Sequence, residues 1–203
     1  MFVKICGITR AEDAAVAVAH GAMAIGFIFW PKSRRYVEPA QARAIVRTLL
    51  PFVTPVGVFV NESVDVMNAV AAQVGLGAVQ LHGDESPDML DAIVPPVVKA
   101  VGRIDEETAT RWPSRVRLLV DADDQVHRGG TGMKADWAGA AILARRRPIV
   151  LAGGLTPENV AEAVTTVRPF GIDVSSGVED APGIKNPEKL RALFEALRGV
   201  ARS

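Results

Sequence analysis

Residues 2–9 read Phe2-Val-Lys-Ile-Cys-Gly-Ile-Thr9, and this stretch favours one of the two folds that the sequence allows. Its apolar start, Phe2 to Cys6, predicts a buried strand. Thr9 stands three residues before Glu12, a spacing that predicts a helix start with a capping box. A strand and then a helix open both (β/α)8 barrels and doubly wound sheets, but the Gly-x-Gly-x-x-Gly turn typical of the latter is absent after Cys6. The stretch therefore favours the barrel.

The same strand-then-helix unit recurs along the whole chain. Most of its apolar runs are continuous in Val, Ile, Leu, Phe and Ala, as in strands covered on both faces of a parallel sheet. After Phe2 to Cys6, the predicted strands are Ala24 to Phe29, Val56 to Val60, Ala78 to Leu81, Val97 to Val101, Val116 to Val120, Pro148 to Ala152 and Gly171 to Ser175. Eight such units in 203 residues predict a single α/β domain, a (β/α)8 or TIM barrel over residues 1–203.

Capping residues before a proline mark three further helix starts. They are Ser86-Pro87, Thr156-Pro157 and Asn186-Pro187, where proline fits the first helical position. The last of these helices has an apolar face that predicts packing on the sheet, made by Leu190, Leu193, Phe194 and Leu197. Gly199 is its expected end.

Charge and cysteine content exclude several classes of protein. Lysine plus arginine equal aspartate plus glutamate at 23 each, so no net field draws the protein to nucleic acid or to an anionic membrane. No apolar stretch approaches the roughly 18 residues of a membrane span, and the N-terminus does not read as a signal peptide. The single cysteine, Cys6, excludes an internal disulfide and fits a reducing compartment. We expect a cytoplasmic protein.

The candidate site residues are the polar residues that end the apolar runs, because the active site of a barrel of this kind lies at the carboxyl ends of its strands. In chain order they are Cys6, Arg34 and Arg35, Asn61, His82, Arg103, Asp121, Gly153 and Gly154, Asp173, and Ser175, Ser176 and Gly177. These side chains are expected to surround one pocket.

The loops after the seventh and eighth strands have the composition of a phosphate site. Gly153 and Gly154 let the backbone approach a ligand closely, and Ser175-Ser176-Gly177 adds two hydroxyls. Many barrels of this class bind phosphate with these two loops. Glycines that only relieve tight turns are the alternative interpretation. Gly129-Gly130-Thr131-Gly132 is a further source of amides, or a lid hinge.

Cys6 and Asp121 each have two interpretations. Cys6 is either a small buried apolar residue or a thiolate, which needs a nearby cation. Lys4, on the same strand face, is such a cation or else a structural ion-pair partner. Asp121 ends an apolar run, where its carboxyl either pairs with a cation or donates a proton.

Two loops carry further charge. Asp123, Asp124 and His127 suggest a metal site together with His82, but their spacing is not that of a ligand set, and we predict no metal. The loop Pro31 to Tyr36 places three cations above the barrel mouth. An arginine there fits a carboxylate with two parallel hydrogen bonds, while a solvated run of charges is the alternative.

The chain resembles the phosphoribosylanthranilate isomerase family in motifs spread over nearly its whole length. The opening Lys4-Ile-Cys-Gly-Ile-Thr9 and the closing Asp173-Val-Ser-Ser-Gly-Val-Glu179 are highly specific when they occur together. Between them, in the same order, the resembling segments are Gly26 to Phe29, Pro31 to Tyr36, Val56 to Glu62, Val79 to Gly83 and Leu151 to Asn159.

The resemblance implies an Amadori rearrangement in tryptophan biosynthesis that needs no cofactor. N-(5′-phosphoribosyl)anthranilate becomes 1-(2-carboxyphenylamino)-1-deoxyribulose 5-phosphate, an aldose-to-ketose isomerisation by general acid–base catalysis. The resemblance gives Asp121 the role of acid on the ring oxygen and Cys6, as a thiolate, that of base on the C2 proton. Asp123 is an alternative acid, but Asp121 directly ends its strand and is held more rigidly.

The resemblance also assigns the binding residues. It places the phosphate at Gly153, Gly154, Ser176 and Gly177, the anthranilate carboxylate at Arg35, the sugar or amine at Asp173, and the anthranilate side at Gln80 and His82. The implied partner is this small phosphorylated substrate, with no metal, and the expected state is a monomer or a homodimer. The alternatives are a metal-dependent sugar-phosphate epimerase and a ligand-binding barrel without activity.

Overall fold

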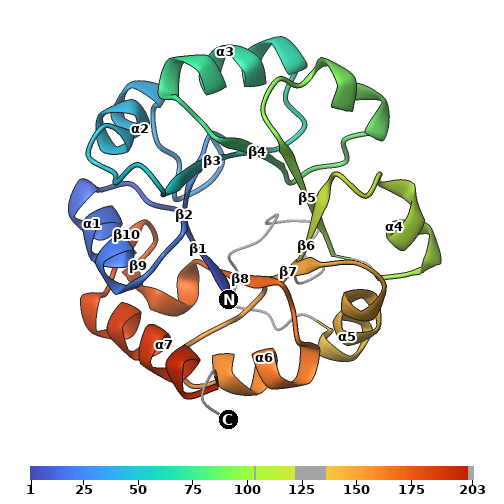
Figure 1. Cartoon of the computed structure of the whole chain (residues 1–203). Coiled ribbons are helices and arrows are strands. Elements are labelled where there is room, and N and C mark those ends of the chain that lie inside the picture. The colour runs from blue at the N-terminus through green and yellow to red at the C-terminus, as the bar shows by residue number, and fades with distance from the viewer. Residues whose placement is uncertain (103, 122–135, 201–203) are drawn as a thin grey trace.

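The computed structural model describes residues 1–102, 104–121 and 136–200, which form a closed barrel of parallel strands (Figure 1). Neighbours in the barrel are neighbours in the chain, and β1 closes it by pairing with both β2 and β8, which excludes the open doubly wound sheet. The strands are β1 (Phe2–Cys6), β2 (Ala24–Ile28), β3 (Thr54–Phe59), β4 (Ala78–Leu81), β5 (Val97–Val101), β6 (Arg117–Val120), β7 (Ile149–Leu151) and β8 (Gly171–Val174). The eight predicted strands and the (β/α)8 fold are confirmed.

Helices cover the outside of the barrel and alternate with its strands (Figure 1). They are α1 (Ala11–His20), α2 (Pro39–Val46), α3 (Val64–Val74), α4 (Glu106–Arg111), α5 (Trp137–Arg146), α6 (Val160–Val167) and α7 (Pro187–Val200), with the 3-10 helices η1 (Pro87–Ala92) after β4 and η2 (Ser176–Val178) after β8. Within the described ranges, none of these helices combines the length and the apolar character that crossing a bilayer requires.

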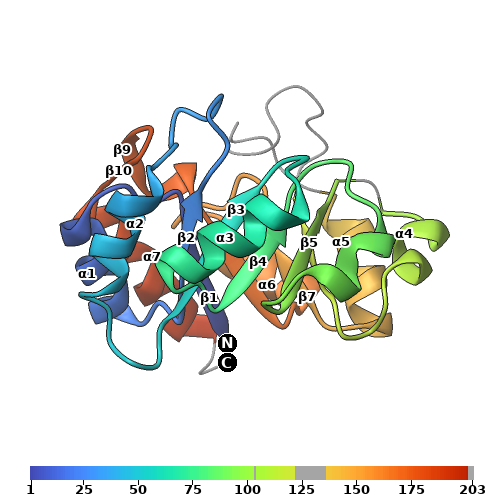
Figure 2. The ribbon, with the colours of Figure 1, turned by 90° about the horizontal axis from the view of Figure 1, so that it is seen from above.

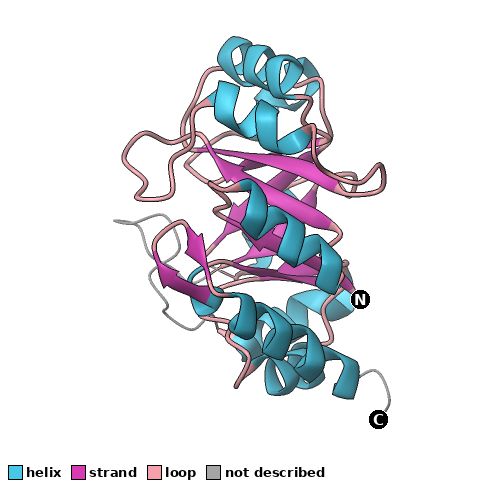
Figure 3. Cartoon of the chain, turned by 90° about the vertical axis from the view of Figure 1, so that its left-hand side faces the viewer, coloured by secondary structure: helices cyan, strands magenta, loops and turns pink. Residues whose placement is uncertain are grey.

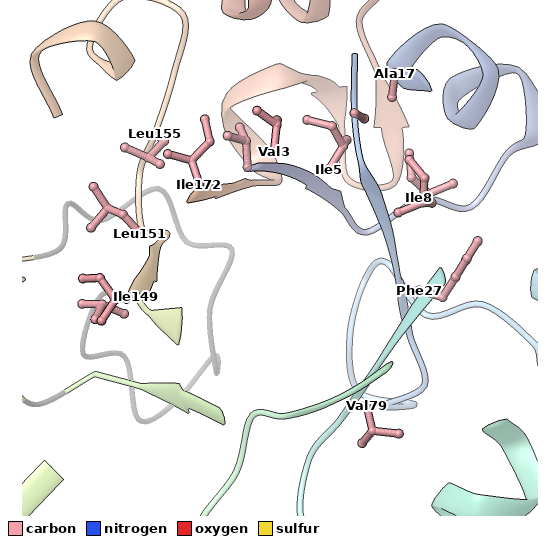
Figure 4. Packing of buried hydrophobic residues seen from close by; sticks show 14 of the residues in the cluster. Val3, Ile5, Ile8, Ala17, Phe27, Val79, Ile149, Leu151, Leu155 and Ile172 are labelled. Atoms are coloured by element: carbon pink, nitrogen blue, oxygen red, sulfur yellow. The ribbon is translucent and has the colours of Figure 1, made fainter. Parts of the chain in front are cut away.

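The main core lies between the ring of strands and the helices. Val3, Ile5 and Phe27 point outward from the strands into this layer, as Figure 4 shows. Alternate residues of a strand point to opposite faces, so Lys4 and Cys6 point into the barrel. The sequence pattern that buries one set of residues in the core thus delivers the other set to the barrel interior.

The helix starts marked by proline are only partly confirmed. Asn186 directly precedes α7, and Ser86 directly precedes η1, which is a 3-10 helix. The third prediction is displaced, since α6 begins at Val160 with Asn159 as its N-cap. The Asn159 side chain accepts the N–H of Thr156 at 2.9 Å, which holds the residues between them in a turn before the helix.

The residue predicted to cap the start of α1 and the residue predicted to end α7 are both wrong. Thr9 does not cap α1, whose N-cap is Arg10, because the Thr9 hydroxyl donates instead to the carbonyl of Gly183 at 2.6 Å. Gly199 does not end α7, which continues to Val200, because Gly199 lacks the positive φ of a helix-stopping glycine. The face of α7 predicted to pack on the sheet is confirmed as buried, made by Leu190, Leu193, Phe194 and Leu197.

A short hairpin follows η2 and stands outside the barrel, as Figure 3 shows. Its strands are β9 (Glu179–Ala181) and β10 (Ile184–Lys185). The backbone N–H of Lys185 donates to the Asp13 carboxylate of α1 at 3.0 Å, which anchors the hairpin. Figure 2 places the hairpin on the same side of the barrel as the loop between β2 and α2, away from the labelled termini. It therefore borders the face where the strands end.

Leu193→Ala is expected to lower the free energy of unfolding by about 2–5 kcal/mol, because it empties a fully buried position between α7 and the barrel. Urea denaturation followed by circular dichroism measures this change. Arg198→Ala, on the exposed side of the same helix, is the matched control and should change the free energy by less than about 0.5 kcal/mol. Equal effects of the two substitutions would contradict the packing described for α7.

Candidate active site

A pocket opens at the carboxyl ends of the strands and has a volume of about 700 Å³, open solvent at its mouth included. Ten of the predicted site residues line it: Cys6, Arg35, Gln80, His82, Asp121, Gly153, Gly154, Asp173, Ser175 and Ser176. Gly177 follows Ser176 but does not itself line the pocket. The expectation that the strand-end residues surround one pocket is therefore met by most of the set.

The wall formed by β1 and β8 holds three buried ionisable side chains. Lys4 and Asp173 are register partners on these strands, and Lys4 Nζ donates to Asp173 Oδ2 at 2.8 Å. Burial raises the pKa of the Cys6 thiol, and the Lys4 ammonium opposes this rise. Burial likewise raises the pKa of Asp173, again opposed by Lys4. Lys4 is thus the cation of this wall, and its interpretation as an ion-pair partner is confirmed.

The charges around Lys4 favour its protonated form. Burial alone would lower the pKa of Lys4, but the charges of Asp173 and Cys6 raise it to about 12. Asp173 Oδ1, in contrast to Oδ2, is buried without a hydrogen-bond partner among the described residues. The wall therefore presents one unsatisfied carboxylate oxygen in the pocket.

The opposite wall carries a short chain of polar contacts. Gln80 Nε2 lies 2.9 Å from His82 Nδ1, and His82 Nε2 lies 3.5 Å from Asp121 Oδ2. If Gln80 Nε2 donates, His82 carries its proton on Nε2, facing Asp121. β6, which Asp121 directly follows, is separated from β1 by two strands on the shorter way around the barrel. Asp121 and Cys6 thus face the pocket from different walls.

The loops after β7 and β8 meet closely. Gly153 and Gly154 have φ angles of 80° and 62°, a left-handed backbone that glycine adopts readily. At Gly177, a Cβ atom would overlap the carbonyl oxygen of Leu155, so only glycine lets the two loops approach this closely. The Ser175 hydroxyl is buried without a partner among the described residues. The two loops therefore bring closely approaching backbone and one unpartnered hydroxyl to the pocket.

Arg35 lines the pocket, and it is held there by a carboxylate. Its Nε and Nη2 donate to the Glu179 carboxylate at 2.8–3.1 Å. Lys185 Nζ also donates to Glu179, at 2.7 Å, and to the carbonyl of Ser175 at 3.2 Å. Burial opposes the ionisation of Glu179, but these two cations lower its pKa below the usual value. The hairpin therefore fixes both the arginine of the β2 loop and the serine of the β8 loop.

Other candidates lie away from the pocket or outside the described residues. Arg34 is exposed and does not line the pocket. Asn61 has a φ of 52°, and its N–H donates at 2.9 Å to Glu85, which is paired with the buried Lys99 at 2.7 Å. It therefore shapes the loops after β3 and β4. The candidates outside the described residues are Arg103, Asp123, Asp124, His127 and Gly129 to Gly132. Within the described part of the chain, no cluster of three or more His, Cys, Asp or Glu suits a metal ion.

Sequence reasoning missed the apolar part of the pocket. Two further pairs line the pocket at the ends of β2 and β3: Ile28 with Trp30, and Val58 with Val60. Each pair is two residues apart, so both members point to the same side of the chain near the end of a strand. The spacing of two residues could have indicated which side chains face the pocket. In a continuous apolar run, however, the residues between them are apolar too, so the sequence does not show which set points inward. The pocket therefore combines an apolar side with two polar walls.

The sequence model described as N-(5′-phosphoribosyl)anthranilate (PRA) isomerase matches residues 3–196. The chain belongs to the N-(5′-phosphoribosyl)anthranilate isomerase family. The family predicted from the motifs is confirmed, and membership makes the chain an isomerase, which decides against an inactive ligand-binding barrel.

Relatives support this membership over nearly the full length. The N-(5′-phosphoribosyl)anthranilate isomerase of Citrifermentans bemidjiense is 48% identical over 98% of either chain. The crystal structure of the phosphoribosyl anthranilate isomerase of Thermus thermophilus is 43% identical, has a TM-score of 0.90 and matches 98% of this chain and 100% of its own. A further solved isomerase of the family, 42% identical with a TM-score of 0.87 and covering 98% and 99% of the two chains, is in complex with reduced 1-(o-carboxyphenylamino)-1-deoxyribulose 5-phosphate.

Gly177→Ala is expected to lower the isomerase kcat/KM by about 10²-fold, because pushing the two loops apart by about 1 Å misplaces whatever they bind. Steady-state kinetics of the purified variant measure the loss. Gly199→Ala is the control, since the added methyl group meets nothing within 4 Å, and it should leave kcat/KM unchanged. Wild-type kinetics for Gly177→Ala would contradict the requirement for close approach.

Proposed function

We propose that this chain isomerises N-(5′-phosphoribosyl)anthranilate to 1-(2-carboxyphenylamino)-1-deoxyribulose 5-phosphate in tryptophan biosynthesis, with Cys6 as base and Asp121 as acid. The observation that carries the proposal is that a thiol and a carboxyl from different walls line one pocket. An aldose-to-ketose isomerisation needs two proton transfers, and two titratable groups on different sides of the sugar can provide them.

Asp121 opens the sugar ring in this proposal. It gives its proton to the ring oxygen as the bond from that oxygen to C1 breaks, and C1 and the anilino nitrogen become a Schiff base. The Asp121 side chain is 12% exposed, which limits competition by water, and His82 Nε2 at 3.5 Å keeps the carboxyl directed into the pocket. Its place at the end of β6 also supports Asp121 over Asp123, which lies outside the described residues.

Cys6 acts on the open-chain form. As a thiolate it takes the proton from C2, and the electron pair of that bond forms the C1–C2 double bond of an enolamine, which tautomerises to the aminoketose. Only a thiolate can do this, and burial raises the pKa of Cys6, so a nearby cation is needed. Lys4 supplies that charge beside the sulfur. Exchange with water then returns Asp121 and Cys6 to their starting states.

The substrate fits the distribution of polar and apolar groups in the pocket. We assign the phosphate to Gly153, Gly154, Ser176 and Gly177 in the loops after β7 and β8, where glycine lets the backbone approach a ligand closely. The Ser175 hydroxyl in the same loop is buried without a partner among the described residues. We assign the anthranilate carboxylate to Arg35, because Arg35 lines the pocket and an arginine binds a carboxylate through charge-assisted hydrogen bonds.

The remaining groups complete the assignment. The aromatic ring packs on the apolar side formed by Ile28, Trp30 and Val58, with Gln80 and His82 at its edge. Asp173, through its unpartnered Oδ1, accepts from the sugar or the amine. The cytoplasmic location, the monomeric or homodimeric state and the lack of a nucleic-acid partner stay predictions.

Cys6→Ser and Asp121→Asn are each expected to lower kcat by at least about 10²-fold, because each removes one positioned proton-transfer group. The fall of anthranilate fluorescence as substrate made in situ is consumed measures turnover.

Asp91→Asn is the control for Asp121→Asn, since Asp91 is exposed and pairs with Arg115 outside the pocket. Thermal unfolding of each variant shows whether it is folded. Full activity of folded Cys6→Ser or folded Asp121→Asn would contradict the role assigned to that residue. Absence of turnover by the folded wild type would contradict the proposed substrate.

Treatment with a chelator is expected to leave kcat/KM unchanged, because both proton transfers are assigned to protein side chains. Activity is compared before and after dialysis against EDTA, and then after addition of zinc or magnesium. A loss restored by one of these ions would instead support a metal-dependent sugar-phosphate isomerisation or epimerisation on the same fold.

A further inference from the structure

Lys4 and Cys6 lie side by side inside the barrel. They are two residues apart on β1 and so share its inner face. The opposite position on β2 is Gly26, the register partner of Cys6. A Cβ atom at Gly26 would lie 2.8 Å from Cys6 Sγ and 3.0 Å from Lys4 Cε, so the thiol and the end of the lysine chain cover the same glycine.

Lys4 has fewer oxygen partners than the other buried lysines that the structure describes. Lys99 Nζ donates to Glu85 and to the carbonyls of Leu81 and Gly83. Lys4 Nζ donates to a single oxygen, Asp173 Oδ2.

An ammonium has three N–H donors, and the sulfur of Cys6 lies beside the end of the Lys4 side chain over Gly26. A neutral thiol is a poor acceptor, whereas a thiolate is a strong one. The ammonium is therefore best satisfied when Cys6 is ionised.

The charged groups that act on Cys6 come from three strands. Lys4 is on β1, Asp173 on β8 and Lys185 on β10, while β2 contributes only Gly26 at this point. Lys185 is engaged by Glu179 and the Ser175 carbonyl, and Asp173 in turn is influenced by Asp121 and His82 across the pocket. Lys4 has the largest favourable effect on the thiolate, and Asp173 the largest unfavourable charge.

We propose that the Lys4–Asp173 pair sets the ionisation of Cys6, with the ammonium stabilising the thiolate and the carboxylate limiting that stabilisation by competing for the same ammonium. Lys4 is a positioning residue in this scheme, since it acts through Cys6. The inference deepens the proposed function and depends on Cys6 being the base for its catalytic meaning. A substrate group that binds Asp173 Oδ1 would draw the carboxylate away from Lys4 and favour the thiolate once the site is filled.

Alkylation of the single cysteine by iodoacetamide over a range of pH tests this proposal, because the rate follows the thiolate fraction and no second thiol contributes. Intact-protein mass spectrometry gives the rate. Lys4→Met should move the midpoint of the profile up, and Asp173→Asn should move it down, each by about one pH unit or more. At a fixed pH below all the midpoints, a shift of one pH unit makes labelling about tenfold slower in Lys4→Met and about tenfold faster in Asp173→Asn than in the wild type.

Two controls separate charge from structural damage. Lys4→Arg keeps the charge and should leave the midpoint closer to the wild type than Lys4→Met does. Lys99→Met removes another buried lysine that pairs with a carboxylate, and it should leave the midpoint unchanged because Lys99 does not line the pocket. If Lys4→Met does not fold, the opposite shift in Asp173→Asn and the retained midpoint in Lys4→Arg decide the matter.

Unchanged midpoints in Lys4→Met and Asp173→Asn, or shifts in the same direction, would overturn the proposal. Either result leaves the proposed function intact if Cys6→Ser is inactive. Full activity of Cys6→Ser, in contrast, would overturn the role of Cys6 as base without affecting the alkylation midpoints. The two hypotheses therefore fail in different measurements.

Discussion

The pairing of β1 with β8 closes the barrel, and the active site depends on that closure. The register of these strands sets Lys4 opposite Asp173, and the next inward position on β1 is Cys6. Strands at the two ends of the chain thus meet to build one wall of the pocket. A slip of this register by one residue would turn the inner side chains outward into the core. The fold and the chemistry are specified by the same hydrogen bonds.

Buried charge is the second constraint on this wall, because an unpaired ion in the interior is costly. Lys4 is paired with Asp173 and Lys185 with Glu179. Glu179 also holds Arg35, so cations from β10 and from the β2 loop share one carboxylate. The polar site is thereby built on rigid strands and a hairpin, with the loops fastened to them.

Much of the architecture was predictable because apolar runs and strand ends are local features of the sequence. The eight strands and the pocket residues at their ends, such as Cys6 and His82, follow from that pattern. Thr9 was mispredicted because its hydroxyl is used by Gly183, which lies 174 residues away in the sequence. The ion pair between Glu179 and Arg35 could not be predicted either, because the two residues are 144 positions apart in the sequence. The proton-transfer roles came from the family resemblance, not from position alone.

The ion pairs of Glu179 with Arg35 and Lys185 couple the loop after β2 to the hairpin, so their residues are constrained to change together in evolution. Replacing Arg35 alone would take one of two cations from the buried Glu179 carboxylate and leave Lys185, and replacing Glu179 alone would leave two cations close together without it. Substitutions at these positions should therefore be strongly non-additive. A new specificity for the acidic group of a substrate would be reached most readily through paired changes, which makes this corner of the barrel slow to diverge.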